Sequence, residues 1–310
     1  MTVSNRLRAL GMGLAAAALM VANAPAALAA YGRAENYQLG FQDSATALFS
    51  DVQWFHNIVL WLMIAVTLFV MGLLIYVMVR FNEKANPKPQ HFHHNTTLEV
   101  LWTLIPILIL VGISVPSFRL LYGQYTFPKA DLTIKATGVQ WYWTYDYPDT
   151  KGVGFDSYPL DDDTKNDSAA LRAKGQDAPR LLAVDNEIVV PVNKVVHVLI
   201  TAKDVIHNWN VPSFGVKSDG VPGRITATWF KAERPGIYYG VCSELCGAKH
   251  AYMPIAVRVV PQDVFAKWLD IRKAGGKGVD DKARAVIQAS LATPNAHVAT
   301  LSGATTAITQ

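Results

Sequence analysis

Two long apolar runs constrain the fold of this sequence more than any other feature. Residues 52–79 and 100–118 contain no aspartate, glutamate, lysine or arginine. A helix needs about 20 apolar residues to cross the hydrocarbon core of a bilayer, so the first run is long enough and the second is close to the minimum. A buried helix in a soluble protein is the alternative, and two such runs in tandem disfavour it. We therefore predict two transmembrane helices, at about 53–79 and 99–121.

The charges beside these runs predict their orientation. The link between the runs carries Arg80, Lys84 and Lys88 against the single acid Glu83. The positive-inside rule therefore places this link in the cytoplasm and the outer ends of both helices on the opposite side of the membrane. The two helices would form a hairpin within a segment that spans residues 30–126.

Residues 1–29 have the pattern of a secretory signal peptide. Arg6 and Arg8 precede an apolar stretch at 10–22, and the small residues at 27–29 offer a cleavage site. A first transmembrane helix is the alternative, but the apolar stretch is short and Pro25 interrupts it. We expect a multi-pass membrane protein, with its main domain on the side of the membrane opposite the cytoplasm.

Residues 127–262 have the pattern of a β-domain. Apolar and polar residues alternate around Ile134, Val198 and Val257, and turn-forming pairs such as Pro235-Gly236 separate the alternating stretches. Many short strands without a long amphipathic helix predict an antiparallel sandwich or barrel. The 15 basic and 15 acidic residues of this region balance, so a basic face for nucleic acid is not indicated. For residues 263–310 we expect a short helix and then a disordered tail rich in alanine and threonine.

The segment from Cys242 to Met253 concentrates the metal-binding chemistry. It holds both cysteines, four residues apart, followed by His250 and then the methionine. Thiolate, imidazole and thioether are soft ligands, which select copper and in part zinc. A second histidine, His207, lies upstream among predicted strands.

Several sites could use these residues. In an exported protein the default for two cysteines is a disulfide, which is sterically possible at this spacing. Structural zinc would take two cysteines and two histidines and leave Met253 without a role. A mononuclear blue-copper site would use only one cysteine. Two bridging thiolates, with one histidine on each metal and weak axial donors, fit a dinuclear copper centre best.

The chain resembles subunit II of cytochrome c oxidase. The resemblance rests on Val-Ile-His-Asn-Trp at 205–209, on Val-Pro-Gly-Arg at 221–224, on the run from Tyr238 to Ile255 around the cysteines, on Gln-Trp-Tyr-Trp-Thr-Tyr at 140–145 and on the helical hairpin. It covers about residues 40–270 and implies a membrane-anchored all-β protein. In this family a cupredoxin-like domain outside the membrane holds the dinuclear copper centre called CuA.

The resemblance assigns the ligands of two copper ions. Cys242 and Cys246 would be the bridging thiolates, and His207 and His250 the terminal imidazoles. Met253 would be the weak donor to one copper, and the Glu244 carbonyl the weak donor to the other. The Glu244 side chain would reach a magnesium or manganese ion shared with subunit I.

The resemblance also implies roles in electron and proton transfer. Trp141 would be the point at which electrons arrive from cytochrome c, and the chain would pass them to the haem–copper subunit I, which reduces oxygen to water with proton pumping. Subunit III would be a further partner. Glu99 would be the entrance carboxylate of a proton-uptake path, although a carboxylate at this position can simply cap its helix. The acids expected to steer a basic cytochrome are Asp146, Asp156, Asp185, Glu187 and Asp204.

Another class of protein could use a similar cysteine motif. A periplasmic copper-delivery or thiol-redox membrane protein also combines Cys-x-x-x-Cys with a distant histidine. It would need a thioredoxin-like βαβ pattern and a single anchor, which the sequence does not suggest. Two coppers per chain would separate these hypotheses.

Overall fold

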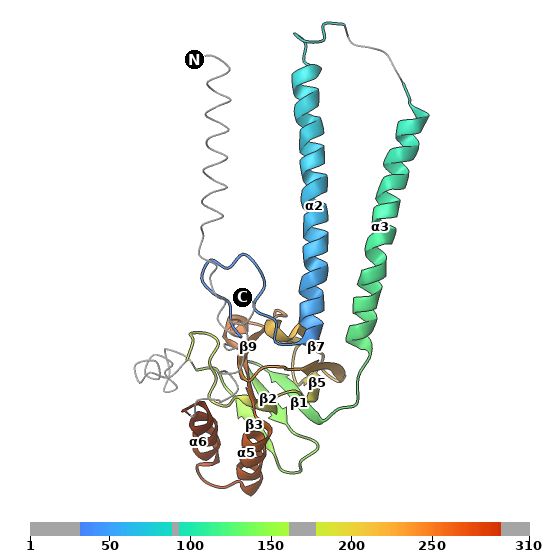
Figure 1. Ribbon diagram of the computed structural model, residues 1–310. Helices are drawn as coiled ribbons and strands as arrows, with labels where there is room; N and C mark the ends of the chain where they lie inside the picture. The colour runs from blue at the N-terminus through green and yellow to red at the C-terminus, as the bar shows by residue number, and fades with distance from the viewer. Residues whose placement is uncertain (1–31, 89–92, 161–177, 293–310) are drawn as a thin grey trace, which may run out of the picture.

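The computed structural model describes residues 32–88, 93–160 and 178–292. These residues form a helical hairpin, a β-sandwich and two C-terminal helices (Figure 1). The predicted signal peptide, residues 1–29, lies outside the described residues.

The hairpin consists of α2 (Ala47–Arg80) and α3 (Thr96–Tyr125), which contain the two predicted spans. At 1.5 Å per residue both helices exceed the roughly 30 Å hydrocarbon core of a bilayer. Their most apolar stretches are 0% buried within the chain, so their apolar side chains face outward. Pro106 and Pro116 lie inside α3 without ending it. Figure 1 shows α2 beginning and α3 ending beside the sandwich, as a helical hairpin requires.

The sandwich has two five-stranded sheets. In the first sheet the order is β3 (Gly154–Ser157), β2 (Tyr142–Asp146), β1 (Leu132–Val139), β5 (Val195–Ala202) and β8 (Thr226–Lys231). In the second it is β4 (Ile188–Pro191), β10 (Pro254–Val260), β9 (Gly236–Cys242), β6 (His207–Val211) and β7 (Val216–Gly220). Of the predicted alternatives, sandwich or barrel, the structure shows the sandwich.

The sheets are mixed, whereas the sequence predicted antiparallel pairing. Strands β1 and β5 pair in parallel, as do β4 and β10, and the other described pairs are antiparallel. Alternation along one strand shows which side chains are buried, but it contains no information about the partner strand. The direction of pairing therefore emerges only when the sheets assemble.

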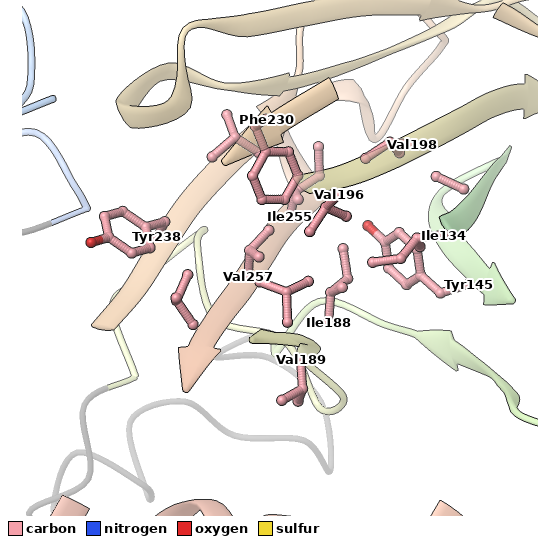
Figure 2. Packing of buried hydrophobic residues seen from close by; sticks show 14 of the residues in the cluster. Ile134, Tyr145, Ile188, Val189, Val196, Val198, Phe230, Tyr238, Ile255 and Val257 are labelled. Carbon is pink, nitrogen blue, oxygen red and sulfur yellow. The ribbon is translucent and has the colours of Figure 1, made fainter. Parts of the chain in front are cut away.

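The core lies between the two sheets. Alternate residues of β1 and β5 are buried, as their sequence pattern predicts. Figure 2 shows side chains from both sheets pointing into the same space, among them Ile134, Val196 and Phe230 from the first sheet and Ile188, Ile255 and Val257 from the second. Burying such side chains stabilises the fold by about 1.5–3 kcal/mol each.

Hydrogen bonds attach both membrane helices to the sandwich. The hydroxyl of Thr46, the residue that caps α2, accepts from the amide of Phe49 at 3.1 Å and donates to the carbonyl of Phe214 at 2.9 Å. The Trp229 indole of β8 donates to the carbonyl of Gln124 near the end of α3, at 3.1 Å. The sandwich is therefore held at two points against the membrane hairpin.

The C-terminal region contains more structure than the sequence predicted. Helix α5 (Gln262–Ala274) matches the expected short helix, but α6 (Val279–Ala292) lies where we expected a disordered tail. The prediction of disorder is wrong for α6 because Ala283 and Ile287, four residues apart, are buried in the core cluster. The remaining residues, 293–310, lie outside the described part of the chain.

Arg272 of α5 connects this helical pair to the sandwich, and its loss should weaken the fold. Its guanidinium lies 4.5 Å from the Phe155 ring centroid and 5.6 Å from that of Trp268. It also forms an ion pair with Asp280 and donates to the Asn186 side chain at 3.3 Å. We expect Arg272→Met to lower the free energy of unfolding by about 2 kcal/mol, because the cation–π and charged hydrogen-bond contributions are lost. Urea denaturation of the detergent-solubilised chain measures this change.

The control for this variant is Lys273→Met, at the neighbouring position. Lys273 is 46% exposed and has only a 3.7 Å contact to Asp270, which is itself 76% exposed. An exposed pair of this kind contributes about 0–1 kcal/mol, so the control should unfold nearly like the wild type. Equal denaturation midpoints for both variants would contradict the anchoring role of Arg272.

Candidate metal centre

Two adjacent strands and the turn between them carry the predicted ligand loop. Strand β9 ends at Cys242, and β10 begins after Met253. A 3₁₀ turn (η2, His250–Tyr252) lies within the loop that connects them. The Cys242 amide donates to the Met253 carbonyl at 3.0 Å, which closes the loop at its base. Because β6 lies beside β9, with Trp209 opposite Cys242, the first residue of β6 is brought next to the loop. That residue is His207.

The four predicted strong ligands converge. The Sγ atoms of Cys242 and Cys246 are 3.8 Å apart, and both cysteines are free and buried. The Nδ1 atom of His207 lies 3.9 Å from the Cys242 sulfur, and that of His250 lies 3.5 Å from the Cys246 sulfur. Each sulfur therefore has one imidazole nitrogen beside it.

The weak donors predicted from the resemblance lie in the same loop. The carbonyl oxygen of Glu244 is 3.4 Å from the Cys242 sulfur. Met253 is 1% exposed and belongs to the core cluster. The Glu244 residue as a whole is exposed, so its side chain is not part of the buried sulfur cluster.

The distance between the two sulfurs suits a metal site better than a disulfide. A disulfide requires an S–S bond of about 2.05 Å, far shorter than the observed distance. A metal–thiolate bond of about 2.3 Å lets one ion bond both sulfurs at this separation. The donors are soft, and the ligand atoms of His207, Cys242 and Cys246 lie within 4.8 Å of one another. The residues therefore fit a thiolate-bridged copper site.

The protonation of the site follows from its contacts. Burial alone would raise the pKa of the Cys242 thiol, but its hydrogen-bonding contacts with the His207 ring and the Asn208 amide lower it to about 7. Burial and the neighbouring Cys242 charge raise the pKa of the Cys246 thiol to about 12. Burial would lower the pKa of His207, but its hydrogen bonds to Cys242 and Asp204 raise it. Two thiolates this close repel each other, and a bound cation would relieve that repulsion.

Asp204 sets the orientation of His207. Its Oδ1 atom accepts from His207 Nε2 at 2.9 Å, and its Oδ2 atom accepts from the backbone amide of Gln140 at 2.7 Å. Burial opposes ionisation, but these hydrogen bonds lower the pKa of Asp204. With the proton on Nε2, the Nδ1 lone pair of His207 faces Cys242 and is free for a metal.

Trp141 and Trp143 differ in their exposure to solvent. Trp143 is fully buried in the core, and its ring meets that of His207 edge-on at 6.0 Å. Trp141 is partly buried, and its indole Nε1 donates to the carbonyl of Cys246 at 3.2 Å. The predicted point of electron arrival therefore contacts a predicted ligand directly.

The acids expected at a docking surface do not all lie beside Trp141, although Asp204 accepts from the adjacent Gln140 amide at 2.7 Å. Asp146 lies at the opposite end of β2, about 17 Å away at 3.3 Å per residue. The Asp156 carboxylate accepts from the Thr144 hydroxyl at 2.8 Å, and Asp185 accepts from the Tyr158 amide at 2.8 Å. Burial raises the pKa of Asp185.

Four of the five acids are hydrogen-bonded or ion-paired within the chain, counting Glu187 and Asp204 with Asp156 and Asp185. Glu187 forms a two-pronged ion pair with Arg258, at 2.7 and 2.8 Å. Asp204 is committed to His207 and to backbone amides, including that of Val205 at 2.7 Å. Their positions in the sequence indicated acidity but could not indicate these partners.

Glu99 lies far from the metal centre. It is in the first turn of α3, at the end of the hairpin remote from the sandwich (Figure 1). Its Oε1 atom accepts from the Asn95 amide at 3.1 Å, while the Asn95 side chain accepts from the Leu98 amide. Glu99 therefore helps to cap the helix, which is the alternative role that the sequence allowed for it.

Two neighbours of the site were missed from the sequence. A Cβ atom on Gly138 would lie 2.6 Å from Cδ2 of His207, so only glycine leaves room for this ligand. A glycine inside an alternating strand often marks such a close approach, and this signal could have identified it. The amide side chain of Gln140 donates to the Cys246 carbonyl at 2.8 Å, and no sequence pattern marks that contact.

Comparisons with known proteins agree over most of the chain. The family model for the periplasmic domain of cytochrome c oxidase subunit II matches residues 132–260, and the model for its transmembrane domain matches residues 34–120. A probable cytochrome c oxidase subunit 2 of Rickettsia bellii is 46% identical over 79% of this chain and 88% of its own length. Cytochrome c oxidase subunit 2 of Cereibacter sphaeroides is 44% identical over 86% of this chain and 91% of its own length.

A solved structure is also similar. It is the periplasmic domain of subunit II of cytochrome oxidase of Bradyrhizobium japonicum, which is 54% identical. The match covers 48% of this chain and 98% of that structure, with a TM-score of 0.42. Helices α5 and α6 lie beyond the range that the family models match.

Proposed function

This chain belongs to the cytochrome c oxidase subunit II family, and we propose that it accepts electrons from cytochrome c at a dinuclear copper centre, CuA, and passes them to the haem–copper subunit I. Membership of the family makes it a subunit of an oxidoreductase complex, with a transmembrane and a periplasmic domain. Reduction of oxygen to water and proton pumping would belong to subunit I. A copper-delivery or thiol-redox protein would not account for this membership.

One observation carries the proposal. Two buried free thiols lie 3.8 Å apart, and each has an imidazole nitrogen within 3.9 Å. This arrangement suits two metal ions that share two sulfur ligands and take one histidine each. The residues that would hold the two copper ions are Cys242, Cys246, His207, His250, Met253 and the Glu244 carbonyl.

When bound, the copper pair would supply one-electron transfer shared between its two ions. The chain contributes rigidity. The loop is closed at its base by the hydrogen bond from Cys242 to Met253, and the Asn208 amide donates to the Cys242 sulfur at 3.5 Å. Asp204 holds His207 in one tautomer. Because these contacts keep the ligands in place, little rearrangement should accompany gain or loss of the electron.

Trp141 is the proposed point of electron arrival. Its indole is partly exposed and reaches the Cys246 carbonyl by a hydrogen bond. A donor cytochrome on this surface would be separated from a bridging sulfur only by the indole, one hydrogen bond and the cysteine itself. For steering we propose Asp146, Asp156 and Asp185, whose effect would act on the association rate and weaken with salt.

The remaining roles concern partners in the membrane. We propose that α2 and α3 pack against subunit I, with subunit III as a further partner, in a bacterial inner membrane. Glu99 would open a proton-uptake path completed by subunit I. The exposed Glu244 residue could supply its carboxylate to a magnesium or manganese ion shared with subunit I, because carboxylate oxygen is a preferred ligand of such hard cations.

Metal analysis of the purified chain tests the central claim. We expect two coppers per chain after copper reconstitution and a mixed-valence near-infrared band, both abolished by His207→Gln. The matched control is His197→Gln, because the His197 ring contacts the Pro128 carbonyl at 2.8 Å and the Phe127 ring at 5.4 Å rather than a predicted ligand. A single zinc, a single copper or a disulfide between the cysteines would overturn the proposal.

A further inference from the structure

We propose that Gln140 is a positioning residue for electron input, which holds the Cys246 carbonyl against the indole of Trp141. This inference rests on the proposed function and adds a residue to it. The starting observation is that two neighbouring side chains donate to one backbone oxygen. The Gln140 Nε2 atom lies 2.8 Å from the Cys246 carbonyl oxygen, and the Trp141 Nε1 atom lies 3.2 Å from the same oxygen.

A carbonyl oxygen has two lone pairs, so it can accept both bonds. The hydrogen bond from the Gln140 side-chain amide is the shorter of the two, and it therefore fixes the direction in which the Cys246 carbonyl points. The second lone pair is then left facing the indole. Without the Gln140 amide, the Cys246 carbonyl would keep, among the described residues, only the longer hydrogen bond from the indole.

The peptide beside this carbonyl is packed tightly against both side chains. A Cβ atom on Gly247, where φ is 119°, would lie 3.0 Å from Cζ2 of Trp141 and 3.1 Å from Nε2 of Gln140. Glycine is thus required there for the backbone to come this close. The loop therefore packs closely against the side chains of residues 140–141.

The backbone of Gln140 is bound to the other half of the site. Its amide donates to Asp204 at 2.7 Å, and Asp204 accepts from His207 at 2.9 Å. Gln140 lies in the tight connection between β1, which ends at Val139, and β2, which begins at Tyr142. Since both its backbone and its side chain are bonded, Gln140 has little freedom and can set the position of its acceptor.

The electron count is simple. One electron leaves the ferrous haem of the donor cytochrome, and one electron is gained at the metal pair. Trp141, Gln140 and Cys246 undergo no net oxidation or reduction, and no covalent bond or proton is transferred. The role of Gln140 is to maintain the hydrogen-bonded contact through which the indole and the cysteine are coupled.

The test uses Gln140→Met, which keeps the length of the side chain and removes its donor. Within a preformed complex with ruthenium-labelled cytochrome c, we expect the first-order rate of electron arrival after a laser flash to fall about tenfold, the lower end of the effect of outer-shell partners. Copper content and the near-infrared band should stay unchanged. Gln140→Asn keeps the amide but is one methylene too short, and it should be slowed similarly. Lys267→Met, at a 70% exposed position on α5, should match the wild type.

A second readout does not depend on copper or on turnover. In the metal-free chain, the ultraviolet resonance Raman difference between wild type and Gln140→Met should show a changed hydrogen-bond-sensitive indole band, and Lys267→Met should show none. An unchanged first-order rate with two coppers bound, or a change confined to the bimolecular rate and its salt dependence, would overturn the inference. An unchanged indole band would also overturn it. Absence of copper from the wild type would instead overturn the proposed function.

Discussion

Replacement of Cys246 by serine should abolish the dinuclear copper centre. The Cys246 sulfur is 3.8 Å from that of Cys242 and 3.5 Å from Nδ1 of His250, so it joins the His250 half of the site to the Cys242 half. A serine hydroxyl is a hard donor and stays protonated at neutral pH, so it cannot act as a bridging thiolate. We expect loss of the near-infrared band, at most one copper per chain and a fall of more than about 100-fold in electron input, beyond the effect of losing an outer-shell partner.

The control should introduce serine into the same loop without touching a ligand. Ala248 is exposed between Cys246 and His250, and Ala248→Ser should retain two coppers and the near-infrared band. Copper analysis, the near-infrared spectrum and stopped-flow reduction by cytochrome c measure the three effects. If Cys246→Ser kept two coppers and the band, the bridging role of its sulfur would be wrong.

Substitution of Gly138 by alanine should displace His207 and so damage the proposed metal site. The added Cβ would lie 2.6 Å from Cδ2 and 2.8 Å from Cγ of His207, closer than real Cβ contacts allow. The imidazole cannot simply move, because Asp204 holds its Nε2 atom and the fully buried Trp143 lies against its ring. Overpacking of this kind costs about 1–3 kcal/mol in stability. The displaced ligand should also weaken copper binding by roughly 10- to 100-fold.

Chelator competition with the reconstituted chain measures the loss of copper affinity, and urea denaturation of the metal-free chain measures the loss of stability. Gly40→Ala makes the same chemical change where no atom lies within 4 Å of the new Cβ, and it should alter neither quantity. Wild-type copper affinity in Gly138→Ala would show that His207 has space that the structure does not indicate, or that it is not a ligand.

The acids expected at the docking surface show that closeness in the sequence does not predict closeness in space. Asp146 is only five residues from Trp141, but an extended strand carries the chain about 3.3 Å per residue, so the two lie at opposite ends of β2. Asp204, by contrast, is 63 residues from Trp141 in the sequence but bonds to the residue beside it. Its place in the sequence suggested a steering charge, and its contacts make it a support for His207.

The C-terminal region illustrates a different limit. The composition of residues after 274 is poor in large apolar side chains, which is typical of disorder. One alanine and one isoleucine, at positions 283 and 287, nevertheless suffice when a neighbouring helix offers a surface to cover them. Composition records the amount of apolar surface, whereas order depends on whether a matching surface exists.

The sequence by itself determined the two membrane helices, the β-rich domain and the chemical type of the metal site. Helix length, alternation and side-chain chemistry are local properties, and the four proposed strong ligands could be named from them. Only the tertiary structure decided that the sulfurs lie 3.8 Å apart, that Gly138 makes room for His207 and that Gln140 reaches the Cys246 carbonyl. These contacts join residues that are remote in the chain, and they exist only because β1, β6 and β9 come together when the two sheets pack.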